Sequence, residues 1–264
     1  PLPSEFQILK NLPWIIEGKR QSQGAVFRWH QKITDWLYTG FSWLFMRVNS
    51  RHSYKLDPQN TATILEPGDK ILLRDNLSEM LTQVGLQEGN TAQLGFGDID
   101  WYIRFGYRWD YQFRFRRIDF GVRAGALFPT GQSRELDRPA SIPFGGNGHW
   151  GAYAQLDLNL ELKEDWQCGF FLRTSKRFKK TANHRMPVNG EPQPFGIVCG
   201  PAEVDPGVTV VLCPWFLLEN LRGGLGLGLN YTLTWHQKDS WCDKRADQSV
   251  AVDLKPVEKT SKWA

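Results

Sequence analysis

Strict alternation between two kinds of residue over residues 97–109 (GDIDWYIRFGYRW) is the feature that most constrains this chain. Every odd position after Gly97 is apolar or aromatic, whereas the even positions hold two Asp and two Arg. A period of two residues indicates a β-strand whose two faces meet different environments. Because one face is aromatic and the other charged, the class of protein depends on which face looks inward.

The same alternation recurs along the chain and predicts an antiparallel up-and-down meander. We expect eight strands, at residues 24–31, 36–48, 97–109, 118–129, 150–162, 166–178, 207–216 and 223–236. The short connections are at 31–35, 110–117, 163–165 and 217–222, and the long ones at 49–96, 130–149, 179–206 and 237–260. Since short and long connections alternate, the long loops should all lie at one end, as in bacterial outer-membrane barrels.

The chain is expected to form a single β-barrel domain over residues 1–264. In the long loop at 49–96, Leu77, Met80, Leu81 and Val84 have helical spacing, so a short amphipathic helix is predicted near 76–86. The chain begins with a loop-like segment, and residues 261–264 have the pattern of the start of another strand after a long loop. We therefore expect a fragment, incomplete at both ends, of a larger barrel with about 10 to 14 strands.

Two architectures are compatible with the alternation. A soluble barrel or sandwich would place the apolar faces inside, whereas a transmembrane β-barrel would place them against lipid. Aromatic residues make up 13% of the chain although its mean hydropathy is −0.44, and they cluster toward predicted strand ends, at Trp101, Tyr107, Trp109, Trp166 and Trp235. The strands also have the length of a tilted bilayer crossing rather than the usual 5 to 6 residues. These features favour an all-β transmembrane barrel.

In that orientation the charged faces line the interior of the barrel. The candidate pore-lining residues are Asp98, Asp100, Arg104, Arg108, Asp119, Arg123, Asp157, Glu161, Arg173 and Arg177. The five arginines, from neighbouring strands, could form a ladder that favours anionic solutes. Alternatively, each arginine pairs with one of the acids and braces the wall. Glycines interspersed on these faces would leave room for the larger side chains.

One stretch resembles a known family of outer-membrane barrels. Strand 97–109 opens with Gly97, Asp98 and Ile99, and its hairpin partner ends with Phe128, Pro129, Thr130 and Gly131. These residues are similar to those of the MetA-pathway-of-phenol-degradation barrels over about residues 90–180. The turn at 110–117 and the loop at 49–96 depart from that pattern. The resemblance implies passage of small, often apolar solutes across the outer membrane, with Gly97, Asp98, Pro129, Thr130 and Gly131 as a structural strand-end motif.

Other kinds of chemistry find little support in the sequence. The net charge of +4 is scattered, so nucleic acid is not expected as a partner. Neither the histidines nor the four cysteines have metal-ligand spacing, and no cofactor is expected. Cys199 and Cys242, in predicted loops, are the better disulfide candidates. No nucleophile–histidine pair is selected by its spacing, so an enzyme is not expected.

The sequence therefore predicts a passive pore or small-solute transporter in the bacterial outer membrane, with lipid and small solutes as its partners. Two alternatives stay open. One is a non-conducting structural or adhesion barrel whose outer loops bind partners, and the other is a soluble, lipocalin-like ligand-binding barrel. The transported solute and the oligomeric state are not determined by the sequence.

Overall fold

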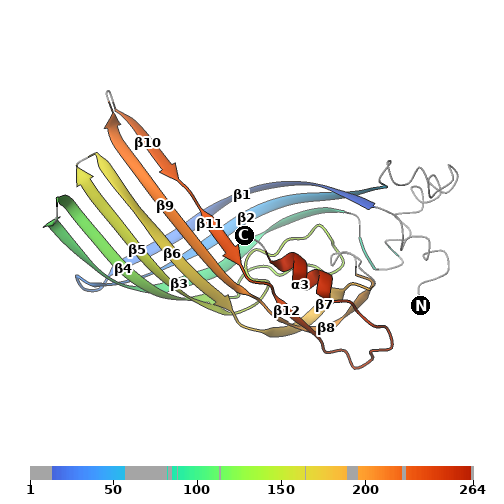
Figure 1. The fold of residues 1–264 in the computed structure, drawn as a ribbon. Coiled ribbons are helices and arrows are strands. Elements are labelled where there is room, and N and C mark those ends of the chain that lie inside the picture. The colour runs from blue at the N-terminus through green and yellow to red at the C-terminus, as the bar shows by residue number, and fades with distance from the viewer. Residues whose placement is uncertain are drawn as a thin grey trace.

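A large antiparallel sheet dominates the structure, a computed structural model shown in Figure 1. Residues 14–56, 82, 85–87, 89–112, 114–163, 165–188, 196–221 and 224–262 are described. The strands follow the order β1–β2–β3–β4–β5–β6–β9–β10, with β11 also beside β9. Their bounds are β1 (Trp14–Lys32), β2 (Leu37–Leu56), β3 (Asn90–Gln112), β4 (Phe115–Phe128), β5 (Gly151–Lys163), β6 (Trp166–Arg177), β9 (Val208–Leu221), β10 (Leu225–Asn230) and β11 (Leu233–His236).

The last two of these strands are one strand interrupted at residues 231–232. β10 pairs with the second half of β9, and β11 pairs with its first half. The sheet therefore has eight strand positions in the predicted order, which confirms the all-β, up-and-down prediction. In Figure 1 the hairpin ends where β1 meets β2, β3 meets β4, β5 meets β6 and β9 meets β10 all lie at one end of the sheet, and the described parts of the connections at 129–150 and 178–207 lie at the other end.

The first three strands are longer than the sequence predicted. β1 begins at Trp14 instead of residue 24, β2 continues to Leu56, and β3 begins at Asn90. Residues 49–56 and 90–96 are therefore strand rather than part of the long loop. The extensions of β1 and β2 lack a regular apolar face, so no alternation marked them as strands. In the extension of β3, Ala92, Leu94 and Phe96 alternate at even positions, out of phase with the alternation that begins at residue 97. The helix predicted near 76–86 falls almost entirely outside the described residues.

A β-bulge in β3 changes which residue numbers face outward. The register shifts opposite Trp43 and Phe45 of β2, so that Phe96 pairs with Phe45 but Ile99 pairs with Trp43. Before the bulge the exposed apolar residues have even numbers, such as Leu94, and after it they have odd numbers. An extra residue in one strand of an antiparallel pair has this effect. The apolar face is therefore continuous along β3, although its residues have even numbers before the bulge and odd numbers after it. Trp101 lies within the strand, not near its end as predicted.

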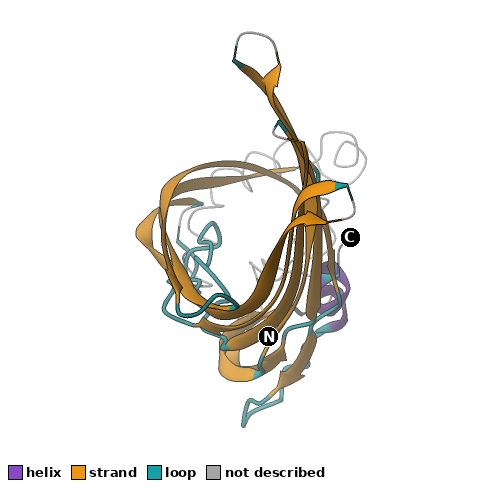
Figure 2. Ribbon diagram, turned by 90° about the vertical axis from the view of Figure 1, so that its left-hand side faces the viewer, coloured by secondary structure: helices purple, strands orange, loops and turns teal. Residues whose placement is uncertain are grey.

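The sheet is apolar on its convex face and polar on its concave face. Figure 2 shows the sheet curving through much of a circle, with loop segments inside the curve. On the convex face Trp101 and Phe105 are 39% and 50% exposed, whereas Arg104 and Asp157 on the concave face are 8% and 5% exposed. A soluble barrel would show the reverse. No helix among the described residues is long and apolar enough to cross a membrane.

A small second sheet lies at the long-loop end, in segments that the sequence predicted as loops. It consists of β7 (Lys180–Met186), β8 (Val198–Asp205) and β12 (Ser240–Asp243) in the order β12–β8–β7, and the helix α3 (Lys255–Ser261) follows. Cys199 and Cys242 therefore lie in strands rather than in loops. Both are exposed free thiols in the structure, and so they do not form the disulfide considered from the sequence.

The small sheet contains a buried histidine that should make it sensitive to acid. The His184 ring packs edge-on against Trp241, with centroids 5.0 Å apart, and its Nε2 has no hydrogen-bond partner among the described residues. Burial, together with the nearby positive charges of His149, Arg134 and Lys180, lowers the pKa of His184 to about 4. Protonation of His184 therefore favours the unfolded state once the pH falls below the ordinary histidine pKa.

We predict that the small sheet loses stability as the pH falls from about 6.5 toward 4, by about 2 kcal/mol at pH 5. Hydrogen exchange of the β7–β8 amides at pH 7.5 and 5.0, corrected for intrinsic rates, should show about a thirtyfold loss of protection. His184→Phe, which cannot take up a proton, should remove this dependence. An equal loss in that variant would assign the effect to another group.

Candidate functional site

The ten residues predicted to line the interior all lie on the concave face of the sheet. Cross-strand register places Arg104 opposite Arg123, Arg108 opposite Asp119 and Gly121 opposite Asp157, so that these side chains share one face. They come from four adjacent strands: Asp98, Asp100, Arg104 and Arg108 from β3, Asp119 and Arg123 from β4, Asp157 and Glu161 from β5, and Arg173 and Arg177 from β6.

Arg104 is the centre of the network that these residues form. Its Nη2 lies 2.6 Å from Asp119 Oδ1 and 2.6 Å from Asp157 Oδ2, and its Nε donates to Asp157 Oδ2 at 3.0 Å. Arg123 Nε contacts the other oxygen of Asp157 at 3.0 Å. The guanidinium thus links three strands through charged hydrogen bonds, which are shorter and stronger than neutral ones.

Two glycines create the space that Arg104 occupies. A Cβ at Gly121 would lie 2.5 Å from Arg104 Cζ, and one at Gly106 would lie 2.7 Å from it. Gly106 and Gly121 are directly opposite each other on β3 and β4. Any larger residue at either position would therefore push the guanidinium away from its carboxylates, as the interspersed glycines of the sequence suggested.

A second cluster lies nearer the long-loop end. Tyr153 donates its hydroxyl hydrogen to Asp100 Oδ1 at 2.6 Å, and Arg173 Nη2 lies 2.9 Å from Asp100 Oδ2. The Arg173 guanidinium also stacks over the Tyr153 ring, 3.7 Å from its centroid. Gly125, opposite Tyr153 on β4, leaves room for that ring. This cluster joins β3, β5 and β6.

Asp98 ties the loop at residues 129–150 to the concave face. It accepts hydrogen bonds from the backbone N–H of Gly131 at 3.0 Å and of Gly146 at 2.7 Å, and Arg177 Nη1 lies 2.7 Å from it. Arg177 also donates to the carbonyl oxygen of His149 at 2.8 Å. Asp98 therefore fixes both the start and the end of this loop, which lies inside the curve of the sheet.

The strand-end motif is brought together in space. Thr130 Oγ1 donates to the carbonyl oxygen of Gly97 and accepts from the N–H of Ile99, both at 3.1 Å. Together with the hydrogen bond between Gly131 and Asp98, these contacts join residues 97–99 of β3 to the two residues that follow Pro129 after β4. Pro129 directly follows the last residue of β4, where a strand can end without losing a ladder hydrogen bond.

The network matches the bracing interpretation of the arginine ladder. Each of the five arginines contacts at least one of the four aspartates. The fifth acid, Glu161, pairs instead with Arg116 and Arg117. Arg108 has the loosest contact, 3.7 Å from Asp119, and its side chain is 56% exposed. Counted together, the ten residues comprise five acids and five arginines and have no net formal charge.

Two features were not predicted from the sequence, one on the concave face and one in the small sheet. Register places Phe171, Val211, Trp215 and Leu217 of β6 and β9 on that face, so that an apolar wall adjoins the charged one. The signal was the almost wholly apolar run at 208–216, which indicates a strand whose two faces are both apolar. The second is buried Arg185, which donates to carbonyl oxygens of Leu136, Gly196 and Gly85 and so holds three loop segments together.

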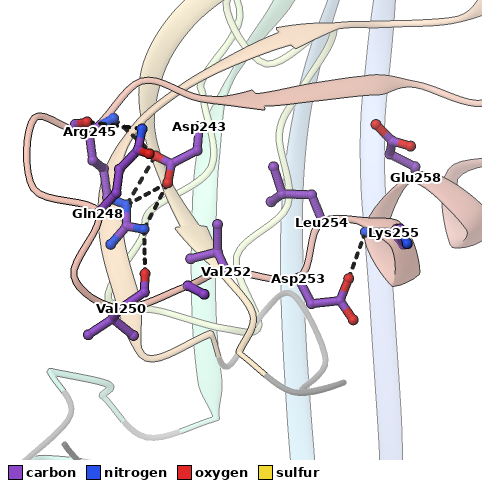
Figure 3. A pocket seen from close by; sticks show the side chains of 10 residues that line it. Asp243, Arg245, Gln248, Val250, Val252, Asp253, Leu254, Lys255 and Glu258 are labelled. Carbon is purple, nitrogen blue, oxygen red and sulfur yellow. Dashed lines mark hydrogen bonds and ion pairs between the residues drawn. The ribbon is translucent and has the colours of Figure 1, made fainter.

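A separate depression of about 400 Å³ lies between β12 and α3 (Figure 3). Its charged groups satisfy one another: Arg245 forms paired hydrogen bonds to Asp243 and donates to the carbonyl oxygen of Val250, and the N–H of Lys255 donates to Asp253. These contacts close a loop and leave little for a ligand. Among the described residues, no group of three or more His, Cys, Asp or Glu could hold a metal ion.

Comparison with known proteins gives a likeness of fold. No protein-family model matches the sequence, and no curated protein matches it. Among solved structures, the chain is similar to the COG4313 outer membrane channel from Pseudomonas putida F1, with a TM-score of 0.50 and 14% identity over 85% of this chain and 65% of that one. The chain thus has the fold of an outer-membrane barrel and spans less than two thirds of that channel.

We predict that Asp157→Ala destabilises the protein by about 3 kcal/mol, because Arg104 and Arg123 then lose their shared buried partner. Urea unfolding in lipid vesicles would measure the change. Arg108→Ala is the matched control: its pair is long and exposed, so its loss should stay below about 1 kcal/mol. Equal losses in the two variants would show that the network does not brace the wall.

Proposed function

We propose that this chain forms part of a passive outer-membrane channel for small solutes and has no enzymatic role. The observation that best supports this proposal is that the outer, convex face of the curved sheet is apolar and the inner, concave face carries charged side chains, the reverse of a soluble barrel. Exposed Trp, Phe, Tyr and Leu side chains lie on its convex face, and a network of paired Arg and Asp side chains lies on its concave face along β3–β6. Lipid outside and a hydrated lumen inside are the environments that such a wall satisfies.

The strands meet the demands of a bilayer. A tilted crossing needs about 9–11 residues, and β4, β5, β6 and β9 have 12 to 14. A spanning sheet must also close, since unpaired edges are not tolerated in hydrocarbon. The proposal therefore requires partners for β1 at one edge and for β10–β11 at the other. The fold of the Pseudomonas putida channel supports the same assignment.

The interior favours small solutes with both polar and apolar parts. The ten charged residues on β3–β6 have no net formal charge, so this wall should exert little preference for anions or cations. The adjoining wall offers Phe171, Trp215 and Leu217 to an apolar portion. This combination agrees with a role like that of the MetA-pathway barrels that residues 90–180 resemble.

The inward loop at 129–150 favours a second candidate, a non-conducting structural barrel. Asp98 and Arg185 fix this loop, together with residues 85–87, at the long-loop end of the sheet. If the loop blocks the lumen permanently, the protein would serve only as a scaffold for its outer loops. The two candidates differ in whether ions pass.

We predict discrete single-channel openings for the full-length protein in planar bilayers, and a larger conductance for Asp98→Ala because the loop loses its attachment to the concave face. Asp100→Ala is the matched control. It lies on the same strand and face but contacts Tyr153 and Arg173 rather than the loop, so its conductance should stay near wild type.

Absence of openings in the wild type and in both variants would contradict a channel and favour the structural barrel. Openings that are equal in wild type and Asp98→Ala would keep the channel but remove the loop from the path of the solute.

A further inference from the structure

Three rows of polar side chains on β1 and β2 continue the convex face toward the long-loop end, and β3 contributes Leu94, Ala92 and Asn90 to the same rows. The last aromatic row pairs Phe45 with Phe96. The next rows pair Gln23 with Arg47, then Gln21 with Asn49, then Lys19 with Arg51. Successive rows are about 7 Å apart along the strands. We call Lys19, Arg47 and Arg51, with the amides between them, the cationic rows.

The cationic rows belong to the outer surface and not to the interior. Exposure alternates along β2: Asn49 and Arg51 are exposed, whereas Val48 and Ser50 between them are 1% and 5% exposed. Lys19 lies directly opposite Arg51 and so belongs to the same outer face. Gln93, on the buried face, accepts a hydrogen bond from the N–H of Ile142 in the inward loop at 2.8 Å. The inner face of β2 and β3 is thus held against that loop at this end.

The cationic rows have unused charge and a concave shape. No ion pair joins Lys19, Arg47 or Arg51 to a carboxylate of the described residues, and Glu17, one row further out, is engaged elsewhere. A shallow depression of about 430 Å³ covers the outer two rows, and Arg47 lies one row beyond it. Its lining residues are Lys19, Gln21, Asn49, Ser50, Arg51, Asn90, Thr91 and Ala92. Three cations with amide donors between them suit phosphate oxygens, which accept charged hydrogen bonds.

The position of the cationic rows relative to the apolar face identifies the source of such phosphates. Arg47 lies one row beyond the aromatic residues that would meet hydrocarbon, which is the level of lipid headgroups. The long-loop end of an outer-membrane barrel faces the exterior. We propose that the cationic rows bind the phosphate groups of a phosphorylated glycolipid in the outer leaflet. This inference rests on the outer-membrane location in the proposed function, but not on conduction.

Binding of lipid A to the detergent-solubilised, full-length protein tests this proposal. Diphosphoryl lipid A should bind with an affinity that falls with added salt, and a dephosphorylated form should bind far more weakly. The triple variant Lys19→Gln, Arg47→Gln and Arg51→Gln should bind diphosphoryl lipid A about a hundredfold more weakly, since each surface cation contributes roughly 1 kcal/mol. Excess inorganic phosphate should not compete fully, which would separate a lipid site from a site for the free ion.

The matched control removes the same charge elsewhere. Lys238→Gln, Lys259→Gln and Lys262→Gln change exposed lysines on the segment around α3 and should leave the affinity within about twofold of wild type. Circular dichroism and heat-modified gel mobility would show that both triple variants fold. Equal binding by wild type and the first triple variant, equal affinity for the dephosphorylated lipid, or full competition by inorganic phosphate would overturn the proposal. Because the assay needs no openings, its failure is distinguishable from failure of the channel function.

Discussion

The structure depends on one constraint: charged side chains on the concave face of a sheet must satisfy one another. Arg104 meets this constraint by contacting Asp119 and Asp157 at 2.6 Å each, across three strands. Burying an unpaired charge is costly, whereas a paired and hydrogen-bonded one is tolerated. The glycines at 106 and 121, the balance of acids and arginines, and the outward direction of the aromatic residues all follow from accommodating this network.

The same principle explains how a loop becomes part of the interior. Asp98 has the same role as the acids that bind Arg104, but two of its partners are backbone N–H groups of the loop at 129–150. The conformation of that loop is therefore set by the wall. The sequence motif that resembles a known barrel family is the part of the chain that makes this attachment, together with Thr130 and the backbone of Gly97 and Ile99.

Strand order, the end at which the long loops lie and the face that carries the charged network could all be predicted from period-two alternation, because each strand has two distinct environments. The alternation also identified the residues of the network, but whether the arginines stand free or pair with acids depends on cross-strand register, which a single sequence does not specify. The extensions of β1 and β2 and the small sheet β7–β8–β12 were missed because they lack a regular apolar face. The extension of β3 was missed because the bulge after Phe96 interrupts its alternation. The apolar inner surface of β9 corresponds in the sequence to an apolar run at 208–216 that lacks alternation. Such a run is compatible with a buried strand or a buried helix segment, so it did not identify the inner face.

The central claim is that the convex face meets lipid and the concave face meets water. Nitroxide labels along β5, in a cysteine-free background reconstituted into lipid vesicles, test it most directly. Labels replacing Leu156, Leu158 and Leu160 should be accessible to oxygen and protected from a water-soluble nickel complex, and labels replacing Gln155 and Asn159 should show the opposite preference. Loss of this alternation, or its reversal, would contradict the account and indicate a soluble barrel with an apolar interior.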